Sequence, residues 1–283
     1  MAASAHPHRR TRLVRSLLLA LGLVLAGARA AHAVSVSPTA LYIDSRTRTG
    51  VLTLHNPGTL PEEITIEFAF GYPVTDTAGN LTVPVTREPA AGEPSAMGWM
   101  RAFPRRLVLQ PGQRQLVRVM VEPPADLPDG EYWARVLVSS RGGQPPIEQT
   151  QGDVRLQLDV ATTLVMAANF RKGSVRTGLE FTAESARRET DGVHLQLDLR
   201  RTGNAAFLGR MRAEVVNERG DVLGTAWDDL AVYRDVRRRH VIPVPAGTTG
   251  PLFVQLTVDT EREDLPAGGA LPVAPLSRRI PVP

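Results

Sequence analysis

The sequence predicts an all-β protein with two β-sandwich domains that follow a cleaved signal peptide. After residue 33, short segments rich in Val, Leu and Thr alternate apolar and polar residues, and Gly, Pro, Asn and Asp separate these segments. No stretch keeps a helical period over three turns. Because one sandwich uses roughly 100–125 residues, the remaining length predicts two domains, at residues 34–170 and 171–283.

Residues 1–33 have the three parts of a secretory signal peptide. Four arginines within residues 9–15 form a basic region, and residues 17–28 form an apolar run too short to span a bilayer as a helix. Ala31-His32-Ala33 is a small-x-small cleavage site, and Ala28-Arg29-Ala30 is an alternative one. We expect cleavage between Ala30 and Ala33 and an exported chain that does not insert into a membrane.

The positive charge of the chain belongs largely to this signal. Residues 1–33 hold five of the 33 basic residues and none of the 29 acidic ones, so the remainder has 28 basic and 29 acidic residues. A nearly neutral chain gives no reason to expect nucleic acid or an anionic membrane as a partner. The sequence contains no cysteine, which excludes thiol catalysis, disulfides and Cys-type zinc sites.

The first domain is predicted to hold eight strands with well-marked turns between them. The predicted strands are residues 35–43, 49–56, 62–70, 80–85, 105–110, 114–122, 131–140 and 153–166. The turn at Gln110-Pro111-Gly112-Gln113 has type II chemistry, because proline presets φ at its second position and glycine accepts a positive φ at its third. Residues 86–97 are rich in Pro, Ala and Gly and are predicted to be a loop.

The second domain is predicted to hold six strands. They are residues 178–185, 192–202, 207–217, 222–227, 237–245 and 251–260. In the strand that begins at residue 192, leucine and valine alternate with polar residues, as in a half-buried strand. Arg219-Gly220-Asp221 is predicted to be a hairpin turn and not an adhesive tripeptide.

Sequence motifs for catalysis or metal binding are missing. His55, His194 and His240 lie far apart without a metal-ligand spacing, and there is neither a GxSxG elbow nor a phosphate-cradling loop. The acidic run at residues 259–264 lacks the EF-hand pattern and is predicted to be a solvated loop. We therefore predict a protein that is not an enzyme, with no catalytic residue, no metal and no cofactor.

The segment from Asp153 to Met166 precedes the predicted domain junction. Its alternation places four apolar side chains on one face, namely Val154, Leu156, Leu158 and Val160. Two interpretations stay open. The segment is either an internal core strand or an edge strand that lends its apolar side chains to another chain by β-augmentation. Because any sandwich strand has this pattern, the pattern alone favours the core strand.

The order of the segments resembles the periplasmic pilus-assembly chaperones, the PapD-like proteins. The shared segments are "SVSPTALYI", the asparagine turn after "LTLHN", the hairpin "LVLQPGQRQLVRV" and the strand "EYWARV", which cover most of residues 35–165. The resemblance implies two immunoglobulin-like domains arranged as a boomerang, a periplasmic location and no catalytic activity. It also implies that the first-domain hairpin is scaffold, with its arginines mostly on a solvated face.

The resemblance further implies two protein partners, a secreted pilus or fimbrial subunit and an outer-membrane usher. The last long strand of the first domain would complete the unfinished sandwich of the subunit, with the four apolar residues between 154 and 160 as donors. Such chaperones hold the terminal carboxylate of the subunit with two cations, but Ala40 and Thr163 occupy those positions here. The candidate replacements are Arg46, Arg48, Arg171 and Lys172.

A second interpretation is a non-chaperone protein of two immunoglobulin-like domains with a structural or scaffolding role in the cell envelope. Its associations would not depend on the apolar face at residues 154–160. A carbohydrate-binding module is disfavoured because Trp99, Trp133 and Trp227 are scattered and only 5% of residues are aromatic. In either case, an exposed edge strand would allow self-association.

Overall fold

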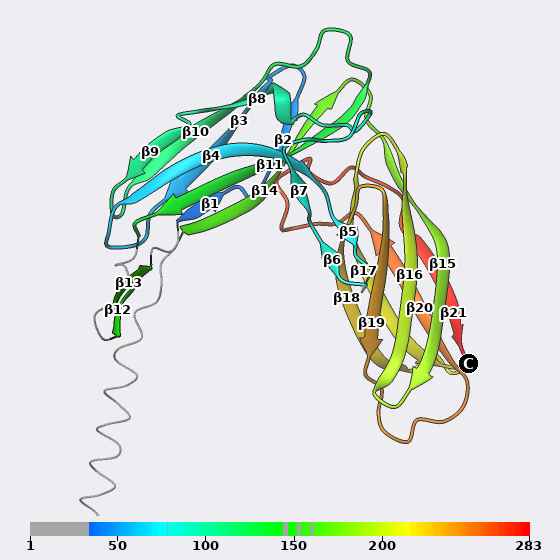
Figure 1. The fold of residues 1–283 in the computed structure, drawn as a ribbon. Coiled ribbons are helices and arrows are strands. Elements are labelled where there is room, and N and C mark those ends of the chain that lie inside the picture. The colour runs from blue at the N-terminus through cyan, green and yellow to red at the C-terminus, as the bar shows by residue number, and fades with distance from the viewer. Residues whose placement is uncertain (1–33, 78, 144–146, 152–153, 159–160) are drawn as a thin grey trace, which may run out of the picture.

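The computed structural model describes residues 34–77, 79–143, 147–151, 154–158 and 161–283, with backbone only for the two short segments 147–151 and 154–158. The predicted signal peptide lies outside the described residues. The described chain forms two β-sandwiches that meet at an angle (Figure 1), which confirms the predicted all-β, immunoglobulin-like fold class. Within the described part, no helix is long and apolar enough to cross a membrane.

The first sandwich packs a four-stranded sheet against a six-stranded sheet. The four-stranded sheet contains, in spatial order, β1 (Ser35–Ser37), β3 (Thr49–His55), β10 (Arg114–Val121) and β8 (Met100–Phe103). The six-stranded sheet contains β2 (Ala40–Asp44), β14 (Ala161–Lys172), β11 (Gly130–Arg141), β4 (Glu62–Gly71) and β7 (Val85–Thr86), with β9 (Arg106–Leu109) also paired to β4. Alternate residues of both sheets point inward and form one core.

The predicted opening strand, residues 35–43, is two strands in different sheets. β1 ends at Ser37, a cis Ser37-Pro38 bond follows, and β2 begins at Ala40. β1 pairs antiparallel with β3, whereas β2 pairs parallel with β14. Proline has no N–H to give to a ladder, so the segment changes sheets where Pro38 interrupts the pairing.

The turn between β9 and β10 has the predicted type II geometry. Gly112 has a φ of 71°, and the N–H of Gln113 donates to the carbonyl of Gln110 at 3.0 Å. The fully buried Asn56 holds this turn from the neighbouring loop, because its amide donates to the carbonyl oxygen of Leu109 at 2.9 Å. The asparagine in "LTLHN" is therefore a structural residue.

The second sandwich packs a three-stranded sheet against a four-stranded sheet around a separate core. The smaller sheet contains β15 (Thr177–Glu189), β16 (Gly192–Gly203) and β19 (Asp235–Ile242). The larger sheet contains β18 (Val222–Val232), β17 (Phe207–Asn217), β20 (Leu252–Asp259) and β21 (Leu276–Val282). Gly220, with a φ of 86°, lies in the turn between β17 and β18, so Arg219-Gly220-Asp221 is the predicted hairpin turn.

One segment of the first domain crosses to the second. We call residues 72–96 the strap; it leaves the end of β4 and carries the small hairpin of β5 (Val74–Thr75) and β6 (Leu81–Thr82) to the side of β19 (Figure 1). The hydroxyl of Thr75 donates to the carbonyl of Arg237 at 2.9 Å and accepts from its N–H at 2.8 Å. The strap thus covers part of the β19 edge that β16 leaves free. The predicted loop at residues 86–97 contains no strand after Thr86.

Candidate binding site at the domain junction and the edge of β14

β14 is the last strand of the first sandwich, and half of one of its edges has no strand partner. It pairs with β11 along all 12 of its residues, but with β2 only at Ala167–Arg171. Among the described strands, none pairs with Ala161–Met166 on the side opposite β11. Such an edge presents unpaired N–H and C=O groups to which another strand can add.

The free half of β14 also carries apolar side chains. Leu164 and Met166 belong to the first-domain core, whereas Val165 points to the other face and is 47% exposed. The hydroxyl of Thr163 lies 2.9 Å from that of Ser139 on β11. An added strand would therefore find both open backbone groups and apolar contacts here.

The structure places the predicted donor residues in a different element from the one expected. Val154, Leu156 and Leu158 lie in β13 (Val154–Leu158), which pairs antiparallel with β12 (Ile147–Gln151) in a separate hairpin. Val160 lies outside the described residues. The last long strand of the first sandwich begins at Ala161 and not at Asp153, so strand donation by these four residues stays a prediction.

A buried ion pair fastens the two sandwiches together. The Arg171 Nε donates to Glu131 Oε2 at 2.7 Å, and the side chain of Glu131 is completely buried. The other carboxylate oxygen, Oε1, accepts from the Trp133 indole and from the backbone N–H of Ala206 in the second sandwich, both at 3.0 Å. The Arg171 guanidinium also donates to the carbonyls of Gly268 and Gly269. Its hydrogen bonds therefore hold the second domain in place.

Stacked aromatic rings lie beside this ion pair. Trp133 from β11 and Tyr233, which follows β18, meet edge to face with ring centroids 4.8 Å apart. Tyr72, at the start of the strap, lies 5.4 Å from Trp133 and 6.1 Å from Tyr233. Burial raises the pKa of Tyr233, so its hydroxyl stays protonated at neutral pH. The junction is a small apolar core shared by the two sandwiches and the strap.

Arg135 is a buried cation at the junction that sequence reasoning missed. Its Nε donates to the carbonyl of Gly71 at 2.9 Å, its guanidinium lies 5.4 Å from the Tyr233 ring centroid, and its Nη2 has no hydrogen-bond partner among the described residues. The residue is only 7% exposed. A charged group at this depth normally has an ionic or hydrogen-bonded partner for each polar atom. Nη2 is itself buried, so an acceptor would reach it only after the side chains that cover it move.

Alanines surround Arg135 on its sheet. In the strand register, Arg135 lies beside Ala69 of β4 and Ala167 of β14, and Ala167 in turn lies beside Ala40 of β2. Ala40 is the position where the resemblance implies a cation. The cation expected on β2 is thus absent. Arg135 occupies the position level with Ala40 across the sheet, two strands away on β11. The signal in the sequence was an arginine within the mostly apolar run Tyr132–Val138, "YWARVLV".

The four predicted replacement cations do not gather at one site. Arg46 and Arg48 lie in the turn after β2, where they are exposed, and Arg48 donates to the carbonyl of Ser45. Lys172 donates to the carbonyl of Leu127. Arg171 does reach the junction, but Glu131 and two carbonyls already occupy it. None of the four is a free cation facing the junction.

Most charged side chains near the junction are paired. Arg171 pairs with Glu131, Arg234 with Glu93 and Arg262 with Asp264. Among the described residues, Arg135 and Arg201 have no carboxylate within 4.0 Å. Burial, followed by repulsion from Arg234, lowers the pKa of Arg201.

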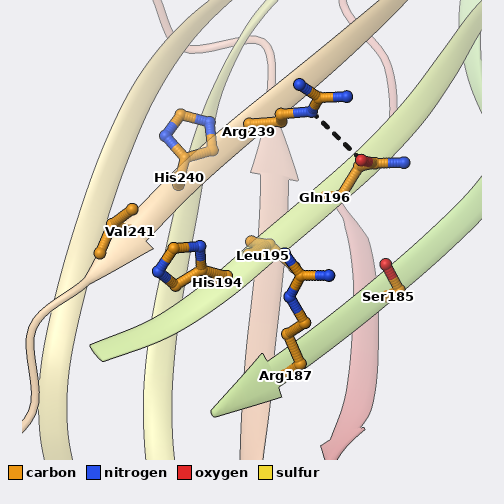
Figure 2. A pocket seen from close by; sticks show the side chains of 8 residues that line it. All are labelled: Ser185, Arg187, His194, Leu195, Gln196, Arg239, His240 and Val241. Atoms are coloured by element: carbon orange, nitrogen blue, oxygen red, sulfur yellow. Dashed lines mark hydrogen bonds between the residues drawn. The ribbon is translucent and has the colours of Figure 1, made fainter. Parts of the chain in front are cut away.

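A depression of about 470 Å³ lies on the face of β15, β16 and β19 (Figure 2). His194, Gln196, Arg187 and Arg239 line it, and the Nε of Arg239 donates to Gln196 at 3.2 Å. His194 lies 2.6 Å from Asp191, and Glu189 lies 2.8 Å from Arg187. Acidic neighbours thus offset the positive charges that line the depression. The described residues contain no group of three or more side chains that could hold a metal ion.

No protein-family model matches the chain, and no curated protein matches its sequence. Among solved structures, the chain is similar to a Salmonella enterica complex of the SafA pilin with the SafB chaperone, at 15% identity and a TM-score of 0.41 over 87% of this chain and 96% of that one. It is also similar to the CsuC–CsuE chaperone–tip adhesion subunit complex of Acinetobacter baumannii, at 11% identity and a TM-score of 0.42 over 88% of this chain and 98% of that one. A third similar structure is the Escherichia coli chaperone DraB, at 13% identity and a TM-score of 0.41 over 88% of this chain and 95% of that one. Identities and TM-scores of this size do not identify a function for the chain.

Proposed function

We propose that this protein is a periplasmic chaperone that binds and stabilises a secreted pilus or fimbrial-type subunit by β-strand donation. The observation that carries the proposal is the free edge of β14 at Ala161–Met166, which ends where the junction between the two sandwiches begins. A signal peptide at residues 1–33 would deliver the chain to the periplasm. An outer-membrane usher would be the second partner. The function needs no catalytic residue and no cofactor.

Strand donation satisfies both partners for a physical reason. A subunit that lacks one strand exposes an apolar groove and a row of unpaired backbone groups. The edge of β14 offers the complementary backbone groups, and the apolar residues that precede it, Val154, Leu156, Leu158 and Val160, would fill the groove. Pairing would hold the subunit until another strand replaces the chaperone.

Arg135 is our candidate for the cation that holds the terminal carboxylate of the subunit. Its unpartnered Nη2 and its place in the row that contains Ala40 favour a carboxylate. The Tyr233 ring packs against the guanidinium, so the carboxylate would have to displace Tyr233 or approach beside it. Arg171 has the different role of joining the two domains.

The solved structures with similar chains support the proposal only by analogy. Their titles describe a chaperone bound to the SafA pilin and a chaperone bound to a tip adhesion subunit. The alternative function, a two-domain structural or scaffolding protein of the cell envelope, is favoured by the strap and the Arg171 bonds, which fix the angle between the domains. A scaffold needs that rigidity and does not need the free edge of β14.

A pull-down from periplasmic extract tests strand donation. The tagged protein would be compared with Leu156→Arg/Leu158→Arg and with Leu164→Arg, and Val241→Arg would be the matched control because Val241 is a half-exposed apolar residue on β19 of the second domain. Mass spectrometry would identify the bound proteins, and circular dichroism would show that each variant is folded.

The proposal predicts a small β-rich secreted protein bound to the wild type and to Val241→Arg. It also predicts that this protein is lost from folded Leu156→Arg/Leu158→Arg or from folded Leu164→Arg. Partners retained equally by all four proteins, or no partner at all, would contradict strand donation and support the scaffolding function.

A further inference from the structure

The outer face of the four-stranded sheet has an unusual composition. Its outward side chains include four exposed apolar residues and three exposed arginines, which we call the basic-apolar face: Val51, Phe103, Leu116, Met120, Arg101, Arg114 and Arg118. The apolar members are between 37% and 71% exposed. No acidic residue points outward from β1, β3, β8 or β10.

The strand register interleaves charge with apolar surface on this face. Arg118 of β10 lies between Val51 of β3 and Phe103 of β8, and on the same strand it lies between Leu116 and Met120. Neighbours across such a sheet are about 5 Å apart. The register therefore places Arg118 beside Val51 and Phe103, and Arg101 beside Met120.

The arginines of this face differ from those of the second domain in their partners. Within the described residues, Arg101, Arg114 and Arg118 have no carboxylate within 4.0 Å. On the second domain, by contrast, exposed arginines such as Arg187 and Arg219 pair with acidic neighbours on their own surface. The three arginines of the basic-apolar face thus differ from these two second-domain arginines in having no carboxylate nearby.

We propose that the basic-apolar face is a docking surface for an acidic protein segment that carries apolar side chains between its carboxylates. Charge complementarity supports this occupant, because the guanidinium groups of Arg114 and Arg118 can each take a carboxylate in a two-point interaction. The Nη1 of Arg101 donates to the carbonyls of Gly98 and Met100, but the residue still contributes its positive charge. Arginine, methionine and aromatic residues are also the types enriched in protein interfaces. The surface is separate from β14 and does not depend on strand donation.

A protein segment fits this face better than an anionic bilayer. Segments that bind at a membrane surface separate a charged face from an apolar face, so that the apolar one sinks below the headgroups. Here Phe103 and Leu116 lie in the same plane as Arg118, and burying them in acyl chains would carry the guanidinium with them. A partner with interleaved carboxylates and apolar groups avoids this cost.

Synthetic strands provide the probe. In an extended peptide Glu-Thr-Val-Thr-Glu-Thr-Phe-Thr-Glu, one face alternates carboxylates with apolar side chains. One control peptide has lysine at each glutamate position, and a second has serine at the valine and phenylalanine positions. Vesicles of phosphatidylglycerol test whether the face binds an anionic bilayer instead of an acidic peptide. Fluorescence anisotropy of labelled peptides would give the dissociation constants at low and at physiological salt.

Two variants separate the charged and apolar contributions. Arg101→Glu/Arg118→Glu reverses the charge, and Phe103→Ser/Leu116→Ser removes apolar surface. All four side chains are exposed, so thermal unfolding should change little. The matched control is Arg187→Glu/Arg219→Glu, which makes the same charge change on the second domain.

The proposal predicts that the acidic-apolar peptide binds the wild type and the control variant, more weakly as salt rises. Each test variant should weaken binding at least about tenfold, roughly the loss of one good contact, and neither control peptide should bind as tightly. The proposal is overturned if the wild type does not bind the peptide at millimolar concentration, if the control variant weakens binding as much as the test variants, or if the arginine-dependent binding is to vesicles instead.

Discussion

Replacement of Glu131 by glutamine should weaken the attachment of the second sandwich to the first. The carboxylate accepts one hydrogen bond from Arg171 and one each from Trp133 and Ala206, and it is the buried counter-ion of the Arg171 guanidinium. Glutamine keeps the shape and one acceptor oxygen. Its amide N–H₂ would face Arg171, however, so a donor would meet a donor and the positive charge would lose its partner.

The expected loss follows from the burial of the pair. The Arg171 side chain is 12% exposed and that of Glu131 is 0% exposed, and breaking a pair this deep costs about 3–5 kcal/mol. Arg171 keeps its two carbonyl acceptors, at Gly268 and Gly269, which reduce the loss. We expect the free energy of unfolding to fall by about 2–4 kcal/mol. The exposed pair of Arg187 with Glu189 is the control, and Arg187→Gln should cost no more than about 1 kcal/mol.

Urea unfolding followed by circular dichroism and tryptophan fluorescence measures both variants. Trp133 lies at the junction, so its fluorescence should change where the domains separate. A two-domain chain need not unfold in one step, and each transition would be fitted by itself. If Glu131→Gln lowers stability no more than Arg187→Gln does, then the ion pair does not join the domains and the account of the junction is wrong.

Three further substitutions test the strap, an ion-paired carboxylate and the hairpin turn. Thr75→Val removes two hydrogen bonds to the Arg237 backbone, so the free energy of unfolding should fall by about 1–2 kcal/mol. Hydrogen exchange at the Arg237 amide should also become faster. Unchanged exchange there would show that the strap does not hold the β19 edge. Asn56→Ala should cost about 2–3 kcal/mol in urea unfolding, because it leaves buried carbonyls without donors, and a loss within experimental error would contradict its role in the turn. Burial would raise the pKa of Asp228, but its bonds to His240 and an arginine outweigh burial and hold that pKa below its ordinary value. The stability advantage over Asp228→Asn should therefore shrink as the pH falls below about 4, and an advantage that persists at lower pH would contradict this sign.

Much of the fold could be read from alternation and turn residues, because these are local signals. The strands of the second domain show this, since all six expected strands are present. The added strand β21 was missed because Arg278 and Arg279 stand side by side and Pro281 interrupts its apolar pattern. The short strands β5 and β8 were also missed, because strands of two and four residues give almost no periodicity.

The boundary of the last first-domain strand could not be read in the same way. Alternation predicted a strand from Asp153 to Met166, but the long strand covers Ala161–Lys172 and the earlier part forms its own hairpin. Both parts are rich in Val, Leu and Thr, and only pairing with β11 and β2 fixes the register. Long-range pairing of this kind leaves no mark in a local pattern.

The junction residues were hidden for a related reason. Arg171 was expected to be a free cation, yet its partner Glu131 lies 40 positions earlier and meets it only because β11 and β14 are adjacent. Arg135 was not singled out in the sequence, because nothing in the local pattern of its strand indicates burial. Its burial comes from Tyr233, which belongs to the other domain. Contacts between domains cannot be deduced from the periodicity of either strand alone.

Backbone hydrogen exchange at Ala161–Met166 tests strand donation most directly. It would be measured by mass spectrometry on the free protein and on the complex isolated from periplasm, with β16 as an internal reference that should not change. The account predicts fast exchange in the free protein at those amides that do not bond to β11, and strong protection of the same amides in the complex. Exchange at residues 161–166 that is the same in both samples would contradict strand donation by β14.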